Sequence, residues 1–250
     1  MRGRHGLPWR RTRSPWRILV SEVMLQQTSV ERVIPLYRDF LARFPTASAL
    51  AAVPLSHALR AWQGLGYNRR AKLLHAAAKD IAERGMPKTA EDLERLPGIG
   101  PYTARAVAAF ASNDDVVFIE TNIRTAAIEH FFPRKKKVSD AEIENVLRAA
   151  LPRGRAREWY GALMDYGASL KRAGVSHNAR SAGYAKQARF AGSAREARGA
   201  VLRSLVRGAS SRSRLANLLG AERRAQVRAA LDALCKEGLV TKRGPIYALP

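Results

Sequence analysis

Apolar residues recur at helical spacing along most of the chain, whereas strand signals are scarce before about residue 239. Ser14 is a favourable N-cap, and Pro15 suits the first position of a helix. The helix that follows carries Ile18, Glu22 and Leu25 at spacings of four and three, so these side chains share one face. Proline and glycine mark turns between further predicted helices over residues 30–43, 68–84, 102–112, 122–132, 139–151 and 156–172. The pattern therefore predicts an all-α main fold.

The composition changes near residue 171. Residues 171–195 are polar and basic, and we interpret them as a linker or as a segment that wraps the main domain. The pattern then resumes, with predicted helices over 194–207, 211–219 and 222–237 and strands over 239–243 and 246–249. Three helices and a hairpin are typical of a winged helix; the alternative is a small appendage that only packs on the rest. We predict a main domain of residues 1–192 and a winged-helix module of residues 193–250.

The charge balance points to a polyanionic partner. The formal net charge is +23, from 44 Lys and Arg against 21 Asp and Glu. Nucleic acid fits because neutralising its phosphates releases counterions, and the arginines are spread over the helical patterns rather than gathered in one tail.

Cysteine and hydropathy patterns exclude other classes. The single Cys235 excludes a disulfide within the chain and any zinc or iron–sulfur site held by several cysteines. No stretch reaches the ~18 apolar residues of a membrane span, and no apolar segment follows the Arg-rich start as in a signal peptide. We expect a soluble, cytoplasmic, nucleoid-associated protein without a metal site or a membrane partner.

The sharpest local motif is the turn from Leu96 to Thr103, with the sequence LPGIGPYT. Gly98 and Gly100 allow a tight turn between two helices and a close approach of backbones. The amides at the start of the following helix are then open to a phosphate. This is the helix-hairpin-helix element, which also occurs in non-catalytic DNA-binding proteins.

Two glutamates are candidate catalytic groups. Glu120 lies 20 residues after Gly100, where the apolar run from Val116 to Ile119 leads into the next helix. Glu22 is an ionisable group on an otherwise apolar helix face, where glutamate is uncommon. The alternatives are an ordinary acid in a first helical turn for Glu120 and a structural salt bridge for Glu22.

Several motifs together resemble the adenine DNA glycosylase (MutY-type) branch of the helix-hairpin-helix (HhH-GPD) glycosylases. They are SEVMLQQT at 21–28, GLGY at 64–67 and the turn at 96–103, with LPWR at 7–10 and MDYGA at 164–168 in the same order. The resemblance covers residues 7–170, and its most specific part is the motif around Glu22.

The resemblance implies a two-lobed helical fold. Residues 19–124 would form a six-helix bundle with the hairpin, and residues 1–18 and 125–192 a second lobe. A monomer would bind double-stranded DNA and flip an adenine opposite 8-oxoguanine or guanine into the cleft between the lobes. The iron–sulfur cluster of typical members is not expected here, because their four cysteines are missing.

The resemblance also assigns roles. Glu22 would protonate adenine N7, Glu120 would stabilise the cationic sugar beside Asn122, and Tyr102 would line the site. Breaking an N-glycosidic bond resembles glycoside cleavage, which uses an acid and a second carboxylate. Tyr102 stands where bifunctional relatives carry a lysine, so strand-nicking lyase activity is not expected. The implied DNA contacts are Gln27, Tyr67, Gly98, Ile99, Gly100 and Thr103; the winged helix adds Arg223, Arg224, Arg228, Lys242 and Arg243.

The chain departs from the family pattern in three places. The cluster cysteines are missing, and the usual Asp is Glu120. The predicted winged helix stands in place of the family's usual C-terminal domain that checks for 8-oxoguanine. The extra methylene of Glu120 would displace its carboxylate by about 1.5 Å, a shift that can reduce the rate roughly a hundredfold.

Two other functions stay open on the sequence. One is a glycosylase of this fold for another base, such as uracil, thymine or an alkylated purine, against which Glu22 argues. The other is a catalytically attenuated DNA-binding protein, which the change to Glu120 favours. DNA binding alone does not require that four residues of the family motifs be retained together, which argues against this second alternative. These residues are Glu22, Gln27, Tyr67 and Tyr102.

Overall fold

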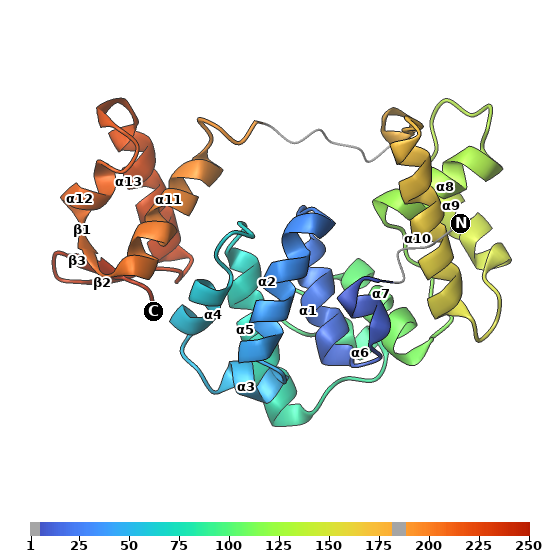
Figure 1. Ribbon diagram of the computed structural model, residues 1–250, viewed down its shortest axis with the longest axis horizontal. Helices are drawn as coiled ribbons and strands as arrows, with labels where there is room; N and C mark the ends of the chain where they lie inside the picture. The colour runs from blue at the N-terminus through green and yellow to red at the C-terminus, as the bar shows by residue number, and fades with distance from the viewer. Residues whose placement is uncertain (1–5, 182–188) are drawn as a thin grey trace. The chain divides into compact units, whose positions relative to one another are not determined.

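The computed structural model describes residues 6–181 and 189–250 (Figure 1). The chain divides into two compact units. Unit 1 comprises Met1–Glu22 and Met86–Lys186, and unit 2 comprises Val23–Gly85 and Gln187–Pro250. Each unit is thus built from two separate stretches of chain. Residues 193–250 group with 23–85 rather than alone, and the domain boundaries proposed from the sequence stay a prediction. The proposed linker or wrapping segment, residues 171–195, lies partly outside the described residues.

The long helices predicted from periodicity are all present. Pro15 begins the first of them, and the amide of Arg17 donates a hydrogen bond to the Ser14 hydroxyl, 3.4 Å away. Ser139 and Glu142 form a reciprocal capping box at the start of another. The bounds are α1 Pro15–Leu25, α2 Val30–Arg43, α5 Arg69–Arg84, α7 Pro101–Ser112, α8 Thr121–Phe131, α9 Asp140–Ala150 and α10 Ala156–Arg172.

Short helices replace several predicted turns. Thr46 and Thr89 cap two of them, each accepting a backbone amide on its hydroxyl. Helices of one or two turns nucleate poorly on their own, and these pack against longer neighbours, α3 and α4 on α5 and α6 on α7. Tertiary packing therefore decides their existence, which periodicity did not indicate. They are α3 Ala47–Ala51, α4 Leu55–Ala61 and α6 Ala90–Glu94, and a further short helix, η1 Pro8–Arg11, precedes α1.

The core of unit 1 lies among α7, α8, α9 and α10. Phe118 and Tyr160 stack at its centre with ring centroids 4.0 Å apart, and Ile123, Ile128 and Leu147 are buried around them. The Tyr160 hydroxyl donates to the carbonyl of Val116 at 2.9 Å, so the apolar run that leads to Glu120 is held against α10.

The end of the chain has the element order of a winged helix. Its three strands form an antiparallel sheet in the order β1-β3-β2, with Ser210 opposite Tyr247 and Lys242 opposite the same residue. The predicted helices and hairpin are present, although the second helix is shorter than predicted. The bounds are α11 Ala194–Arg207, β1 Ser210–Ser211, α12 Arg212–Ala216, η3 Ala221–Arg223, α13 Arg224–Lys236, β2 Thr241–Arg243 and β3 Ile246–Ala248, with η2 Asn178–Arg180 before them.

This C-terminal part packs on α4 and α5 within unit 2. The amide of Ser56 donates to the carbonyl of Pro250 at 3.0 Å, and Lys72 donates to the carbonyl of Glu237. Across residues 6–181 and 189–250, no helix combines the length and apolar character needed to cross a membrane.

The packing of α10 on α8 depends on Gly167. A Cβ at this position would lie 2.0 Å from the carbonyl oxygen of Asn122. We expect Gly167→Ala to lower the free energy of unfolding by ~1–3 kcal/mol or more, because helix backbone has to move. Gly161→Ala in the same helix is the matched control, since its Cβ would meet only Arg10 Nη1 at 3.6 Å. Urea unfolding followed by circular dichroism measures both, and equal stability of the two variants would contradict the prediction.

Candidate active site

Glu22 is buried in unit 1 with a tyrosine as its hydrogen-bond partner. Its side chain is 5% exposed, on a face of α1 where Ile18 is also buried. The Tyr102 hydroxyl donates to Glu22 Oε2 at 3.0 Å. Glu22 makes no ion pair among the described residues, so the salt-bridge alternative is not what the structure contains. Burial raises the pKa of Glu22 from 4.5 to about 7, although the Tyr102 hydrogen bond opposes the rise.

Tyr102 lies in the first turn of α7, directly after the hairpin turn. Gly98 has φ +76°, which glycine adopts without strain, and the amide of Ile99 closes the turn on the carbonyl of Leu96 at 3.1 Å. Gly100 is the N-cap of α7 and Pro101 its first residue. Burial, followed by the charges of Glu22 and Glu120, raises the pKa of Tyr102 well above 10, so its hydroxyl stays protonated and able to donate.

The turn offers backbone rather than side chains to a ligand. Gly98 and Gly100 are exposed, whereas Ile99 and Thr103 are buried. The DNA contacts predicted for Ile99 and Thr103 stay predictions. Because both side chains are buried, such contacts would be made by the backbone of the turn. A Cβ at Gly100 would meet nothing within 4 Å, so no close backbone approach within the described chain accounts for this glycine.

Glu120 is the N-cap of α8. Its Oε1 accepts hydrogen bonds from the amides of Asn122 at 2.6 Å and Ile123 at 2.8 Å. Burial raises the pKa of Glu120, while these amides and the charges of Lys171 and Arg10 oppose the rise. The charge of Glu120 in turn contributes to the raised pKa of Glu22, so unit 1 brings the two glutamates together. The alternative considered on the sequence is an ordinary acid in a first helical turn. The structure places Glu120 one residue earlier, as the N-cap, which is also a structural role.

Two cations at the site were not predicted. The charge of Arg10 lowers the pKa of both glutamates, and its Nη1 donates to Asp165 Oδ2 at 3.0 Å and to the carbonyl of Gly161 at 3.1 Å. Burial lowers the pKa of Lys171, while the charge of Glu120 opposes the fall. Arg10 belongs to the LPWR motif, which could have signalled it; Lys171 stood in a basic run where nothing distinguished it.

The proposed DNA probes, Gln27 and Tyr67, lie in unit 2 on two loops joined by Arg70. Both have positive φ, 54° and 46°, which non-glycine residues rarely adopt. Arg70 Nη1 donates to the carbonyls of Val23 at 2.7 Å and Gln26 at 2.5 Å, and its Nη2 to the carbonyl of Leu65 at 3.2 Å. Arg70 therefore ties the end of α1 to the loop of Tyr67, a role that the sequence did not signal.

Tyr67 also contacts the C-terminal part of unit 2. Its side chain is 37% exposed. Arg195 Nη1 donates to the Tyr67 hydroxyl at 2.9 Å, and the guanidinium of Arg195 lies 5.9 Å from the ring centroid. Arg195, a residue of α11, therefore lies beside Tyr67, one of the predicted DNA contacts.

The basic residues proposed for the winged helix differ in their surroundings. Arg228, Lys242 and Arg243 are exposed, and Arg224 is exposed with its Nε donating to Asn217 Oδ1 at 2.6 Å. Arg223 is instead held by Glu196, with 2.7 Å between Nη1 and Oε2 and 22% of its side chain exposed. Its role as a DNA contact stays a prediction, and the ion pair with Glu196 would compete with a phosphate for its guanidinium.

The family model described as "HhH-GPD superfamily base excision DNA repair protein" matches residues 20–153. The chain belongs to this superfamily, which confirms the helix-hairpin-helix reading of the turn at 96–103. The match spans Glu22, Tyr102 and Glu120.

Three relatives of the chain carry the name adenine DNA glycosylase. The chain is 44% identical over 174 residues to the adenine DNA glycosylase of Mycolicibacterium smegmatis, which covers 67% of this chain and 59% of that protein. It is 43% identical over 180 residues to the adenine DNA glycosylase of Mycobacterium tuberculosis (68% and 58%), and 39% identical over 129 residues to that of Homo sapiens (47% and 24%). The chain thus spans less than two thirds of the length of these relatives.

Solved structures confirm the fold class. A thermostable thymine-DNA glycosylase aligns with a TM-score of 0.56 at 24% identity, covering 65% of this chain and 77% of the other. A trapped endonuclease III–DNA covalent intermediate aligns with a TM-score of 0.54 at 20% identity, covering 65% and 76%. At these identities the likeness concerns the fold alone.

The Tyr102 hydrogen bond can be tested without an activity assay. Tyr102→Phe is expected to raise the pKa of Glu22 above about 7, because the hydrogen bond from Tyr102 favours the ionised form. Titration of the Glu22 side-chain carbon by NMR, assigned with Glu22→Gln, measures the shift. Tyr160→Phe is the control, since that hydroxyl bonds to the backbone of Val116 and Phe118. An unchanged or lower pKa in Tyr102→Phe would refute the assignment.

Proposed function

We propose that this chain is a monofunctional DNA glycosylase that hydrolyses the N-glycosidic bond of adenine mispaired with 8-oxoguanine or guanine. The observation that carries the proposal is Glu22, a buried carboxyl group that Tyr102 holds and whose pKa burial raises to about 7. A carboxyl group that is half protonated near neutral pH is suited to general acid catalysis. The names of the similar mycobacterial and human proteins support adenine as the base.

In the proposed mechanism, Glu22 donates its proton to N7 of a flipped adenine. The bond between the sugar C1′ and N9 breaks, its electron pair goes to the base, and adenine leaves as a neutral molecule. Glu120 stabilises the positive charge that develops on the sugar, and water adds to C1′ and loses a proton. No amine stands at Tyr102, so a Schiff base and strand cleavage do not follow at that position.

The surroundings of Glu120 support its charged form. Oε1 accepts two amides at the start of α8, where the helix dipole also favours a negative charge. Arg10 and Lys171 add positive charge nearby. Burial, the largest effect, raises the pKa of Glu120, and these amides and cations oppose the rise. In the proposed reaction Glu22 supplies the proton, and Glu120 acts in its ionised form.

Further parts of the proposal concern partners and cofactors. We infer that the chain acts as a monomer in the cytoplasm on double-stranded DNA, without an iron–sulfur cluster. The backbone of the turn at 96–103, Gln27, Tyr67, Arg224, Arg228, Lys242 and Arg243 would contact the duplex. The exposure of Arg228, Lys242 and Arg243 in the C-terminal part supports its use as a DNA-binding module.

The assay of base release tests the function directly. Duplexes carrying A:8-oxoguanine, A:G, U:G or T:G are incubated with the protein, and abasic sites are cleaved with alkali. We expect release of adenine, and a loss of ~10²- to 10⁴-fold in Glu22→Gln with DNA binding kept, because the amide cannot donate the acid proton. The wild-type rate should fall about tenfold per pH unit above pH 7, where Glu22 loses its proton. Release of uracil or thymine alone would assign another base, and a fully active Glu22→Gln would refute the acid role.

A second candidate, an attenuated DNA-binding protein, is favoured by the capping role of Glu120, since Oε1 is already engaged by two amides. Glu120→Gln and Glu120→Asp separate the two. If Glu120 is catalytic, both substitutions should reduce the single-turnover rate, Gln by orders of magnitude through loss of charge and Asp through its shorter reach. A Glu120→Gln protein as fast as wild type would place the second carboxylate elsewhere. A much faster Glu120→Asp protein would favour the attenuated enzyme.

A further inference from the structure

A basic loop joins α8 to α9 in unit 1. It consists of Arg134, Lys135, Lys136 and Lys137, and all four residues are exposed. Lys135 forms an ion pair with Glu142. Within the part of the chain that the structure describes, the other three make no ion pair, so their charges are available to a partner.

The carboxylates near the basic loop are already paired. Asp140 accepts hydrogen bonds from Arg124, with Nη2 and Oδ2 3.0 Å apart. Glu129 contacts His177 Nε2 at 2.5 Å. The hydrogen bond from Lys135 and those from Ser139 lower the pKa of Glu142 to about 2, so it stays ionised and keeps Lys135 paired. The loop therefore keeps an excess of positive charge that its own neighbours do not cancel.

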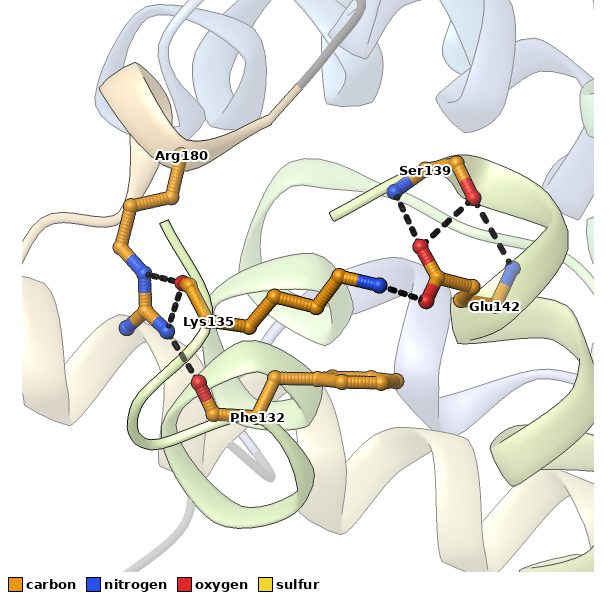
Figure 2. Close-up of polar contacts among 5 residues, drawn as sticks. All are labelled: Phe132, Lys135, Ser139, Glu142 and Arg180. Carbon is orange, nitrogen blue, oxygen red and sulfur yellow. Dashed lines mark hydrogen bonds and ion pairs between the residues drawn. The ribbon is translucent and has the colours of Figure 1, made fainter. Parts of the chain in front are cut away.

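Arg180 holds the backbone of the basic loop in place. Figure 2 shows its guanidinium against the carbonyl of Lys135, with Nε at 2.9 Å and Nη2 at 2.6 Å, and Nη2 also donates to the carbonyl of Phe132. The amide of Val138 donates to the carbonyl of Arg180 at 2.9 Å, and Val138 forms a parallel bridge with Ser181. Phe132 is the C-cap of α8, so Arg180 satisfies carbonyls that the helix end leaves open.

The anchoring of the loop backbone by Arg180 lowers the entropy cost of binding a ligand. A loop whose backbone is already ordered loses less conformational entropy when its side chains engage a ligand. The guanidinium of Arg180 is itself bound to backbone carbonyls. The positive charge that the loop exposes therefore comes from its lysines and Arg134.

α8 links the basic loop to the proposed catalytic group. The helix has 11 residues and Glu120 caps its N-terminus, so at ~1.5 Å per residue the loop lies about 16 Å along the helix from Glu120. Phosphates follow one another at 3.4 Å per strand along the axis of duplex DNA, so this span corresponds to about five base pairs. A duplex engaged at Glu120 is long enough to reach the loop.

We propose that the basic loop of residues 134–137 is a binding surface for the phosphodiester backbone of duplex DNA, several base pairs from the excised base. The inference rests on the proposed function for its partner, and it adds a contact in unit 1 to those proposed at the turn and in the C-terminal part. Such a surface raises affinity for any sequence, because phosphate contacts carry no base information.

The test compares two double variants of the full chain. Lys136→Gln with Lys137→Gln removes two charges from the basic loop. Arg148→Gln with Arg153→Gln removes two exposed charges of unit 1 that line a different hollow, together with Asp115 and Glu144. Binding to an undamaged duplex is followed by fluorescence anisotropy over a series of salt concentrations. The loop variant should reduce the slope of log K against log salt by about 1.8, at 0.9 for each lost contact, and the control should leave it close to wild type.

Two results would overturn the proposal: an unchanged slope in the loop variant, or an equal fall in both variants, which would assign the effect to net charge alone. Circular dichroism melting checks that both variants are folded. Single-turnover adenine release by the wild-type protein is measured in parallel. No release by the wild type would refute the proposed function while leaving the loop result standing, so the two failures are distinguishable.

Discussion

The chemistry proposed for unit 1 depends on the burial of one carboxyl group, that of Glu22. Burying Glu22 destabilises its ionised form, and the charge of Glu120 adds to this effect. Tyr102 and Arg10 oppose it, so the pKa settles at about 7 rather than higher. This intermediate pKa suits a general acid. A carboxyl group with a much higher pKa would not release its proton, and one with a pKa of 4.5 would already be ionised at neutral pH.

The start of α8 serves two purposes through one side chain. Glu120 satisfies amides that every helix leaves open, and the same amides favour its negative charge. The position of this helix depends on Gly167, where α10 approaches the carbonyl of Asn122 more closely than a Cβ would allow. Local capping thus fixes the carboxylate of Glu120, while backbone packing positions the helix that it caps.

Arginine and histidine side chains connect the start of the chain and the segment after α10 to the helices of unit 1. The sequence has no cysteine in these segments. Arg157 Nη2 donates to the carbonyls of Arg10 and Thr12, each at 2.8 Å, which ties the start of the chain to α10. His177 and Arg180 tie the segment after α10 to the end of α8. Guanidinium groups suit this task because one planar fork reaches several carbonyls at once and keeps its charge.

Periodicity, caps and turn residues in the sequence determined the long helices, the hairpin turn and the winged-helix order, because these depend on local spacing. The motif residues also marked Glu22, Tyr102 and Glu120. Only the tertiary structure decided what depends on distant partners: the short helices α3, α4 and α6, the buried side chains of Ile99 and Thr103, and the ion pair that engages Arg223. The same holds for Arg10, Arg70 and Arg180, whose partners lie far along the chain, so no local pattern could indicate what a long, flexible guanidinium side chain would reach.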